Sequence, residues 1–199
     1  MDCGCKAKAA SPGQRRVLLI ALGLNATMFV VGIIAGLAAQ STGLIADSLD
    51  MLADATAYGI ALSASRRGAA FKAKAAKLSG AMLLVLSMGV LLDVARRSVA
   101  GSAPVSGIMM GVASISLLVN ASVLYLLGKH RDDGVHLRAT WIFTRADVIA
   151  NAAVIASGLV ILYTDWRIAD LVVGAAIGIY IIKEALEILR EARHAAEAA

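Results

Sequence analysis

The chain has 199 residues, of which 59% are hydrophobic and 17% are charged, and its formal net charge is +5. Its mean hydropathy is +0.78. Soluble domains are about 45–50% apolar and about 25% charged, so this composition excludes a conventional soluble enzyme, a disordered chain and a secreted disulfide scaffold. It predicts a polytopic membrane protein, because a helical span takes about 20 apolar residues and the length allows about six spans.

Six apolar runs follow one another along the chain and predict an all-α membrane protein with six transmembrane helices. The runs cover residues 17–39, 44–64, 78–95, 105–128, 139–163 and 168–182. The helical pattern of the last run continues into residues 183–187. We therefore expect residues 1–16 and 191–199 to be short tails, and residues 17–190 to form one six-helix transmembrane domain without a separate soluble domain.

Lysine and arginine residues concentrate on one side of these six spans. Fourteen of the nineteen lie in residues 1–16, in the loops 66–77 and 129–138 and from residue 190 onward, whereas three lie on the other side. Basic residues favour the cytoplasmic side of a membrane protein. The pattern predicts that both termini are cytoplasmic.

The second span carries three carboxylates, Asp47, Asp50 and Asp54. Asp50 and Asp54 are four residues apart and share one helix face, and Asp47 lies near that face one turn earlier. An aspartate at bilayer depth is costly, so intramembrane carboxylates are functional candidates by default.

The fifth span carries Asp147 and Asn151, also four residues apart. With a rise of 1.5 Å per residue, Asp54 lies about 15 Å and Asp147 about 12 Å from the cytoplasmic ends of their helices. Asp50 and Asn151 lie about 21 Å and about 18 Å deep. Two helices of opposite direction are therefore predicted to bring oxygen ligands to matching levels near the midplane.

Three carboxylates that face one another repel unless they are protonated or bound to a cation. A divalent cation requires deprotonated ligands, so its binding displaces protons. The pattern therefore favours a metal/proton exchanger in which Asp50, Asp54 and Asp147 serve both metal binding and proton coupling. The alternative is that these aspartates are neutral and only hydrogen-bond the helices together.

Three stretches carry a resemblance to a known family. Residues 44–55, Leu-Ile-Ala-Asp-Ser-Leu-Asp-Met-Leu-Ala-Asp-Ala, resemble the helix 2 signature of the cation diffusion facilitator family. Residues 25–29, Asn-Ala-Thr-Met-Phe, are similar to its Asn-x-x-x-Phe pattern, and residues 141–151 resemble its helix 5 motif. The resemblance covers nearly the whole chain. It implies a homodimeric antiporter that exports divalent cations against inward protons, with Asp50, Asp54 and Asp147 as ligands.

The resemblance also implies the cargo and the setting. We expect Zn²⁺ or Cd²⁺ to be favoured, with Mn²⁺, Co²⁺ and Fe²⁺ as alternatives, and no resident cofactor. Protons and the lipid bilayer are the other expected partners, and nucleic acid is not one. The expected location is the bacterial inner (plasma) membrane.

The sequence departs from the family pattern in two places that matter. Phe143 stands where the family usually has His or Asp, four residues before Asp147, so Asn151, Asn25 or water is expected to complete the ligand shell. An all-oxygen site is harder and weakens the case for strict zinc selectivity. The chain also stops after the sixth span, which predicts a short member without the cytoplasmic metal-binding domain.

Two other function classes remain open at this point, although we expect a transporter and not an enzyme. An intramembrane aspartyl protease also needs two midplane carboxylates on different helices, but Asp147 follows Arg-Ala instead of a Gly-x-Gly motif. A proton-coupled exporter of organic cations would favour an aromatic lining, and aromatic residues make up only 5% of the chain.

Several weaker signals have two interpretations each. Cys3 and Cys5 could capture a soft cation, although two thiolates are too few for a closed zinc site, or they belong to a dispensable tail. Asp47 either tunes proton uptake or hydrogen-bonds a neighbouring helix. Asp93 and Asp170 lie near the outer ends of their spans and are expected at the interface. The remaining expectations are that Asn120 serves helix packing and that three glycines serve close packing or turns: Gly32, Gly36 and Gly43.

Overall fold

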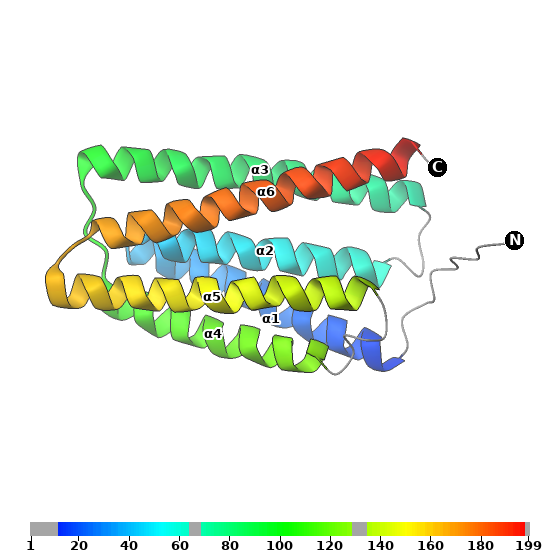
Figure 1. Ribbon diagram of the computed structural model, residues 1–199, viewed down its shortest axis with the longest axis horizontal. Helices are drawn as coiled ribbons and strands as arrows, with labels where there is room; N and C mark the ends of the chain where they lie inside the picture. Colours follow the sequence, from blue (N-terminus) through cyan, green and yellow to red (C-terminus); the bar gives the residue numbers. More distant parts are fainter. Residues whose placement is uncertain (1–11, 64–68, 129–134, 198–199) are drawn as a thin grey trace, which may run out of the picture.

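The structure is a computed structural model that describes residues 12–63, 69–128 and 135–197. These ranges contain six helices and no strand. The helices are α1 (Pro12–Ala38), α2 (Thr42–Ser63), α3 (Ala69–Ala100), α4 (Ser106–Gly128), α5 (Val135–Thr164) and α6 (Ile168–Glu197). They lie lengthwise beside one another in one bundle (Figure 1). The all-α expectation with six long helices is confirmed.

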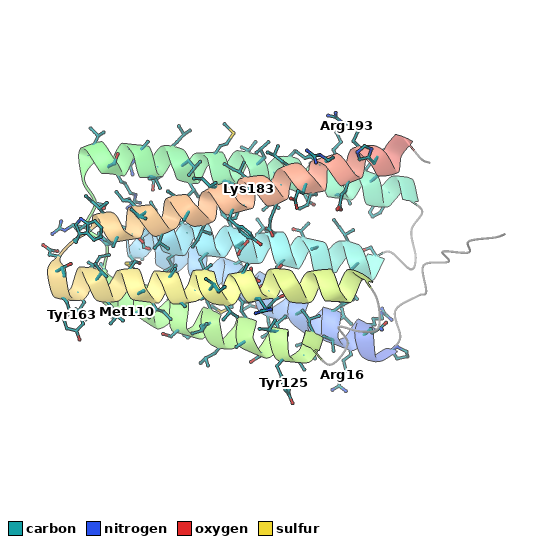
Figure 2. The ribbon with its side chains drawn as sticks, viewed as in Figure 1. Arg16, Met110, Tyr125, Tyr163, Lys183 and Arg193 are labelled. Atoms are coloured by element: carbon teal, nitrogen blue, oxygen red, sulfur yellow. The ribbon has the colours of Figure 1, made fainter. Side chains whose placement is uncertain are left out.

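The two ends of the bundle differ in the way that the distribution of basic residues predicts. The first described residues of α1 and the last of α6 lie at the same end (Figure 1). Figure 2 shows Arg16 and Arg193 at this end and Tyr163 at the opposite one. We call the first the basic end and the second the outer end.

Several helices extend beyond the apolar runs that predict them, among them α3, α5 and α6. α3 begins at Ala69 instead of residue 78, α5 begins at Val135 instead of residue 139, and α6 continues to Glu197. An apolar run marks only the stretch that suits hydrocarbon. The added turns are rich in Ala, Lys, Glu and Arg, which are good helix formers, so each helix continues past the apolar part.

Four of the described helices are long and apolar enough to cross a membrane by length and composition. They are α1, α4, the part of α3 from Ala73 and the part of α5 from Thr144. α2 contains three aspartates and the second half of α6 is charged, which lowers the hydropathy of both. α2 packs against α1, α3, α5 and α6, so other helices cover its polar face. The chain is a polytopic membrane protein, and α2, which carries the three aspartates, lies among four other helices of the bundle.

Glycines let α2 approach both of its closest neighbours. A Cβ on Gly32 of α1 would overlap Ser48 Oγ, and one on Gly36 would lie 2.8 Å from Ile45 Cγ1. On the other side, a Cβ on Gly174 of α6 would lie 2.8 Å from the Thr42 carbonyl carbon. The expected packing role of Gly32 and Gly36 is confirmed. These contacts also fix the register, since α1 runs antiparallel to α2 and α6 runs parallel to it.

Asp170 caps the N-terminus of α2, which corrects the expectation that it lies at the interface. The residue is fully buried. Its carboxylate accepts hydrogen bonds from the backbone N–H groups of Thr42 (2.7 Å) and Gly43 (3.1 Å) and from the Ser41 hydroxyl (2.6 Å). The first N–H groups of a helix have no partner within it and carry partial positive charge, so an anion from α6 stabilises them.

The turn between α1 and α2 has a second support at the same end. Gln40 adopts a φ of 51°, and its carbonyl accepts a hydrogen bond from Arg97 Nη1 at 2.6 Å. Arg97 in turn pairs with Asp93, whose Oδ2 lies 2.5 Å from Arg97 Nε. Asp93 keeps 26% of its side chain exposed, as expected for an interfacial residue.

We predict that Asp170→Ala destabilises the bundle by about 1–3 kcal/mol, because buried N–H groups at the start of α2 lose their acceptor. Thermal unfolding of the purified protein in detergent measures the effect as a lower Tm. Asp165→Asn is the control. The Asp165 side chain is 77% exposed, so the loss of its charge is expected to leave Tm unchanged. An Asp170→Ala protein with the Tm of the control would contradict the capping role.

Candidate functional site

The three aspartates of α2 lie on one stripe that continues to Tyr58. Asp47, Asp50, Asp54 and Tyr58 are spaced by three or four residues, so they follow one face of the helix. Asp47 and Asp50 are buried, whereas Asp54 is half-buried. Leu, Met and Ala surround these positions in the sequence and favour the helix. The stripe turns toward α4, α5 and α6, and each neighbour meets a different part of it.

The outer part of the stripe is bonded to α4 and α5. Asn151 Nδ2 donates a hydrogen bond to Asp47 Oδ1, and Asn120 Nδ2 donates to Asn151 Oδ1 at 3.0 Å. Asp47 therefore hydrogen-bonds a neighbouring helix, one of its two expected roles, and Asn120 serves packing as expected. Both ends of the Asn151 amide are bonded to protein groups. The depth estimate paired Asn151 with Asp50, and the structure pairs it with Asp47, one turn nearer the outer end.

Asp147 brings the carboxylate of α5 to the middle of the stripe. It lies one turn from Asn151 toward the basic end, and its carboxyl group interacts with those of Asp50 and Asp54. Asp50 and Asp147 are 5% and 6% exposed, and the Oδ2 atom of each has no hydrogen-bond partner among the described residues. Buried polar atoms normally have a partner because an unpaired one costs free energy. The carboxyl groups of Asp50 and Asp147 are close enough to share a hydrogen bond, so a shared proton or a cation would satisfy these oxygens.

Tyr58 and Thr144 hold the end of the stripe nearest the basic end. The Tyr58 hydroxyl donates to Asp54 Oδ2 at 3.1 Å and lies 3.4 Å from Thr144 Oγ1. Both residues are buried. Neither is among the site residues expected from the sequence, although the i, i+4 spacing of Asp54 and Tyr58 is the signal that could have revealed Tyr58.

Asn25 lies on α1 at the level of Asp54. Gly32 meets Ser48 and Gly36 meets Ile45, so the antiparallel register brings Asn25 level with residues 55–56 of α2, within two residues of Asp54. Asn25 is fully buried, and its Nδ2 donates to the Ala21 carbonyl at 3.0 Å. Its Oδ1 has no hydrogen-bond partner among the described residues.

Glu184 of α6 is a fourth acidic residue that sequence reasoning missed. It is half-buried, its Oε1 accepts a hydrogen bond from the Tyr180 hydroxyl at 2.8 Å, and its charge acts on Asp50 and Asp147. In the sequence it reads as part of a charged helix end. Glu184 lies fourteen residues after Asp170, which places both near the same face of α6. This spacing is the sequence signal that could have indicated that Glu184 faces the bundle.

The arrangement does not form a closed metal cage. Across residues 12–63, 69–128 and 135–197, no three His, Cys, Asp or Glu side chains converge closely enough to hold a metal ion. Asp50, Asp54 and Asp147 are neighbours whose oxygens would have to draw together around a cation. Cys3 and Cys5 lie outside the described residues, as does the side chain of Phe143.

Comparison with known proteins agrees with this architecture. The chain is 28% identical over 195 residues to the zinc transporter ZitB of Pectobacterium atrosepticum, which covers 92% of this chain and 61% of that protein. It is 25% identical to ZitB of Escherichia coli over 88% of this chain and 60% of the relative. It is 20% identical to a cadmium, cobalt and zinc/H(+)-K(+) antiporter of Bacillus subtilis, over 91% of this chain and 63% of the relative.

The chain thus spans about three fifths of the length of these relatives. Residues 18–195 match the cation efflux transmembrane domain, which takes in all six helices and every residue of the stripe on α2. The chain therefore belongs to the cation efflux family, the cation diffusion facilitators that its second and fifth helices resemble.

Proposed function

We propose that the protein exports a divalent metal cation in exchange for protons, through a site formed by Asp50, Asp54 and Asp147. The observation that carries the proposal is the pair of buried oxygens, Asp50 Oδ2 and Asp147 Oδ2, without a hydrogen-bond partner among the described residues. They belong to two different helices, α2 and α5, and a cation between them would satisfy both. Membership of a cation efflux family supports this use of the carboxylates.

The same three carboxylates account for the coupling to protons. Close carboxylates in a low dielectric repel one another unless a cation or protons offset their charge. A metal ion binds only the deprotonated groups, so binding releases protons and reprotonation releases the metal. If the site opens alternately to the two sides of the membrane, it exchanges the metal ion for protons.

The donor set and the relatives together suggest the cargo. Carboxylate oxygens accept several divalent cations, including Zn²⁺, Mn²⁺, Co²⁺ and Fe²⁺. The relatives are described as zinc transporters and as an antiporter of cadmium, cobalt and zinc. We favour Zn²⁺ or Cd²⁺ as the transported ion, with no resident cofactor.

Asn25 is the better of the two amides for completing the ligand shell. Its buried Oδ1 lacks a partner among the described residues and lies at the level of Asp54. Asn151 already bonds Asp47 and Asn120 with both ends of its amide. We therefore assign Asn25 a ligand role and Asn151 the role of holding α5 in register with α2.

The proposed function also implies a membrane, an orientation and an oligomeric state. We place the protein in the bacterial inner membrane as a homodimer, with the basic end of the bundle in the cytoplasm. An intramembrane protease also uses two buried aspartates on different helices, but the family is one of transporters. Cation-dependent proton flux separates the two functions, because a protease has none.

We predict that Asp54→Asn abolishes zinc-dependent proton flux in proteoliposomes, because one carboxylate of the site is lost. Asp47→Asn is the matched control on the same helix. It removes the same charge, but its Oδ1 still accepts the hydrogen bond from Asn151, so flux persists. Equal loss in both variants would contradict the assignment of the site, and no flux with any of the cations named above would contradict the function.

We predict that Asp147→Asn weakens Zn²⁺ binding by about tenfold to a hundredfold, which is about 1.4–2.8 kcal/mol. In the native protein, acidification weakens binding because protons compete for the same oxygens. The variant displaces fewer protons, so its affinity changes less steeply with pH. Calorimetric titration in detergent at several pH values measures both effects, and unchanged affinity would remove Asp147 from the site.

A further inference from the structure

The position of Glu184 follows from the way α6 packs against α2. The two helices run in the same direction, and Thr42 contacts both Asp170 and Gly174. Parallel helices keep this offset because both rise by the same distance per residue. Twelve residues after Thr42 on α2 comes Asp54. Twelve residues after Asp170 and Gly174 on α6 come residues 182 and 186, so Glu184 lies beside Asp54.

The surroundings of Glu184 are acidic. Its charge acts on Asp50 and Asp147, and that of Asp54 acts on it. Its one hydrogen bond to a described residue comes from Tyr180, and no described Lys or Arg forms an ion pair with it. Lys183, its neighbour in sequence, is exposed. Four carboxylates therefore gather in one place without a basic side chain among the described residues to offset them.

Two features indicate that this cluster can bind a ligand. Asp50 Oδ2 and Asp147 Oδ2 are buried acceptors without a partner in the described part of the chain. Glu184 differs from both because it is half-buried, so its carboxylate connects those oxygens with the surface of the bundle. A small cation that reaches Glu184 from the surface would next meet the carboxylate of Asp54, whose charge acts on Glu184.

We propose that Glu184 is a further cation-binding residue, which takes up the divalent ion at the mouth of the site and passes it to Asp54, Asp50 and Asp147. Tyr180 orients the carboxylate by donating to Oε1, which leaves Oε2 for the ion. This inference rests on the proposed function. It adds α6 to a site otherwise built from α1, α2 and α5.

The test is the zinc dependence of transport by the full chain in proteoliposomes, with the variants Glu184→Gln, Glu184→Asp and Glu191→Gln. Glu184→Gln keeps the shape of the side chain and is expected to raise the half-saturating Zn²⁺ concentration about tenfold, with the maximal rate within about twofold. Glu184→Asp keeps the charge and restores most of the native value. Glu191→Gln changes an exposed residue of the same helix and behaves as the native protein.

Two outcomes would overturn the inference while leaving the proposed function intact. One is a native half-saturating concentration in Glu184→Gln. The other is a lower maximal rate at an unchanged half-saturating concentration, which indicates a structural role. A native protein that transports neither Zn²⁺ nor Cd²⁺ would overturn the proposed function, and the role of Glu184 with it. Calorimetric titration of the same variants with Zn²⁺ gives the affinities independently of reconstitution.

Discussion

The hydrogen bonds between Asp170 and the first turn of α2 set the level of everything that follows along that helix. An unsatisfied helix N-terminus would be costly inside the bundle, and a single carboxylate from α6 satisfies it. The close contact of Gly174 with Thr42 fixes the same register sterically. Because both helices rise equally from this point, the acidic residues of α2 and α6 reach the same level farther down.

The polar stripe of α2 has two parts with different degrees of hydrogen bonding. Near the outer end, Asp47, Asn151 and Asn120 form a connected chain across three helices. Such a chain ties α4 and α5 to α2 and fixes their register. Nearer the basic end, Asp50 and Asp147 each keep one buried oxygen without a partner among the described residues. The first part holds the helices in place, and the second has unused capacity to bind a ligand.

The sequence predicts the helices and the stripe of aspartates well, because both depend on local patterns. Apolar runs report spans, and a carboxylate within a span is rare enough to be noticed. It does not predict what Asp170 and Glu184 do. Their roles depend on which residue of a distant helix lies opposite them, and hydropathy contains no information on that register. The prediction that Asn151 lies level with Asp50 is wrong by one turn for the same reason, since its partner is Asp47 and depths counted from helix ends ignore differences in helix length.

The lack of space between Gly174 and Thr42 also limits how α2 and α6 can move. Their backbones already touch at the outer end, where a single methyl group would clash. A change in the angle between the two helices would therefore pivot about this contact. Asp54 lies about 18 Å along the helix from it. A tilt of about ten degrees would therefore separate the helices by about 3 Å beside Asp54 and Glu184 while barely changing the outer end. The packing therefore leaves more freedom for α2 and α6 to separate beside Asp54 and Glu184 than at the outer end.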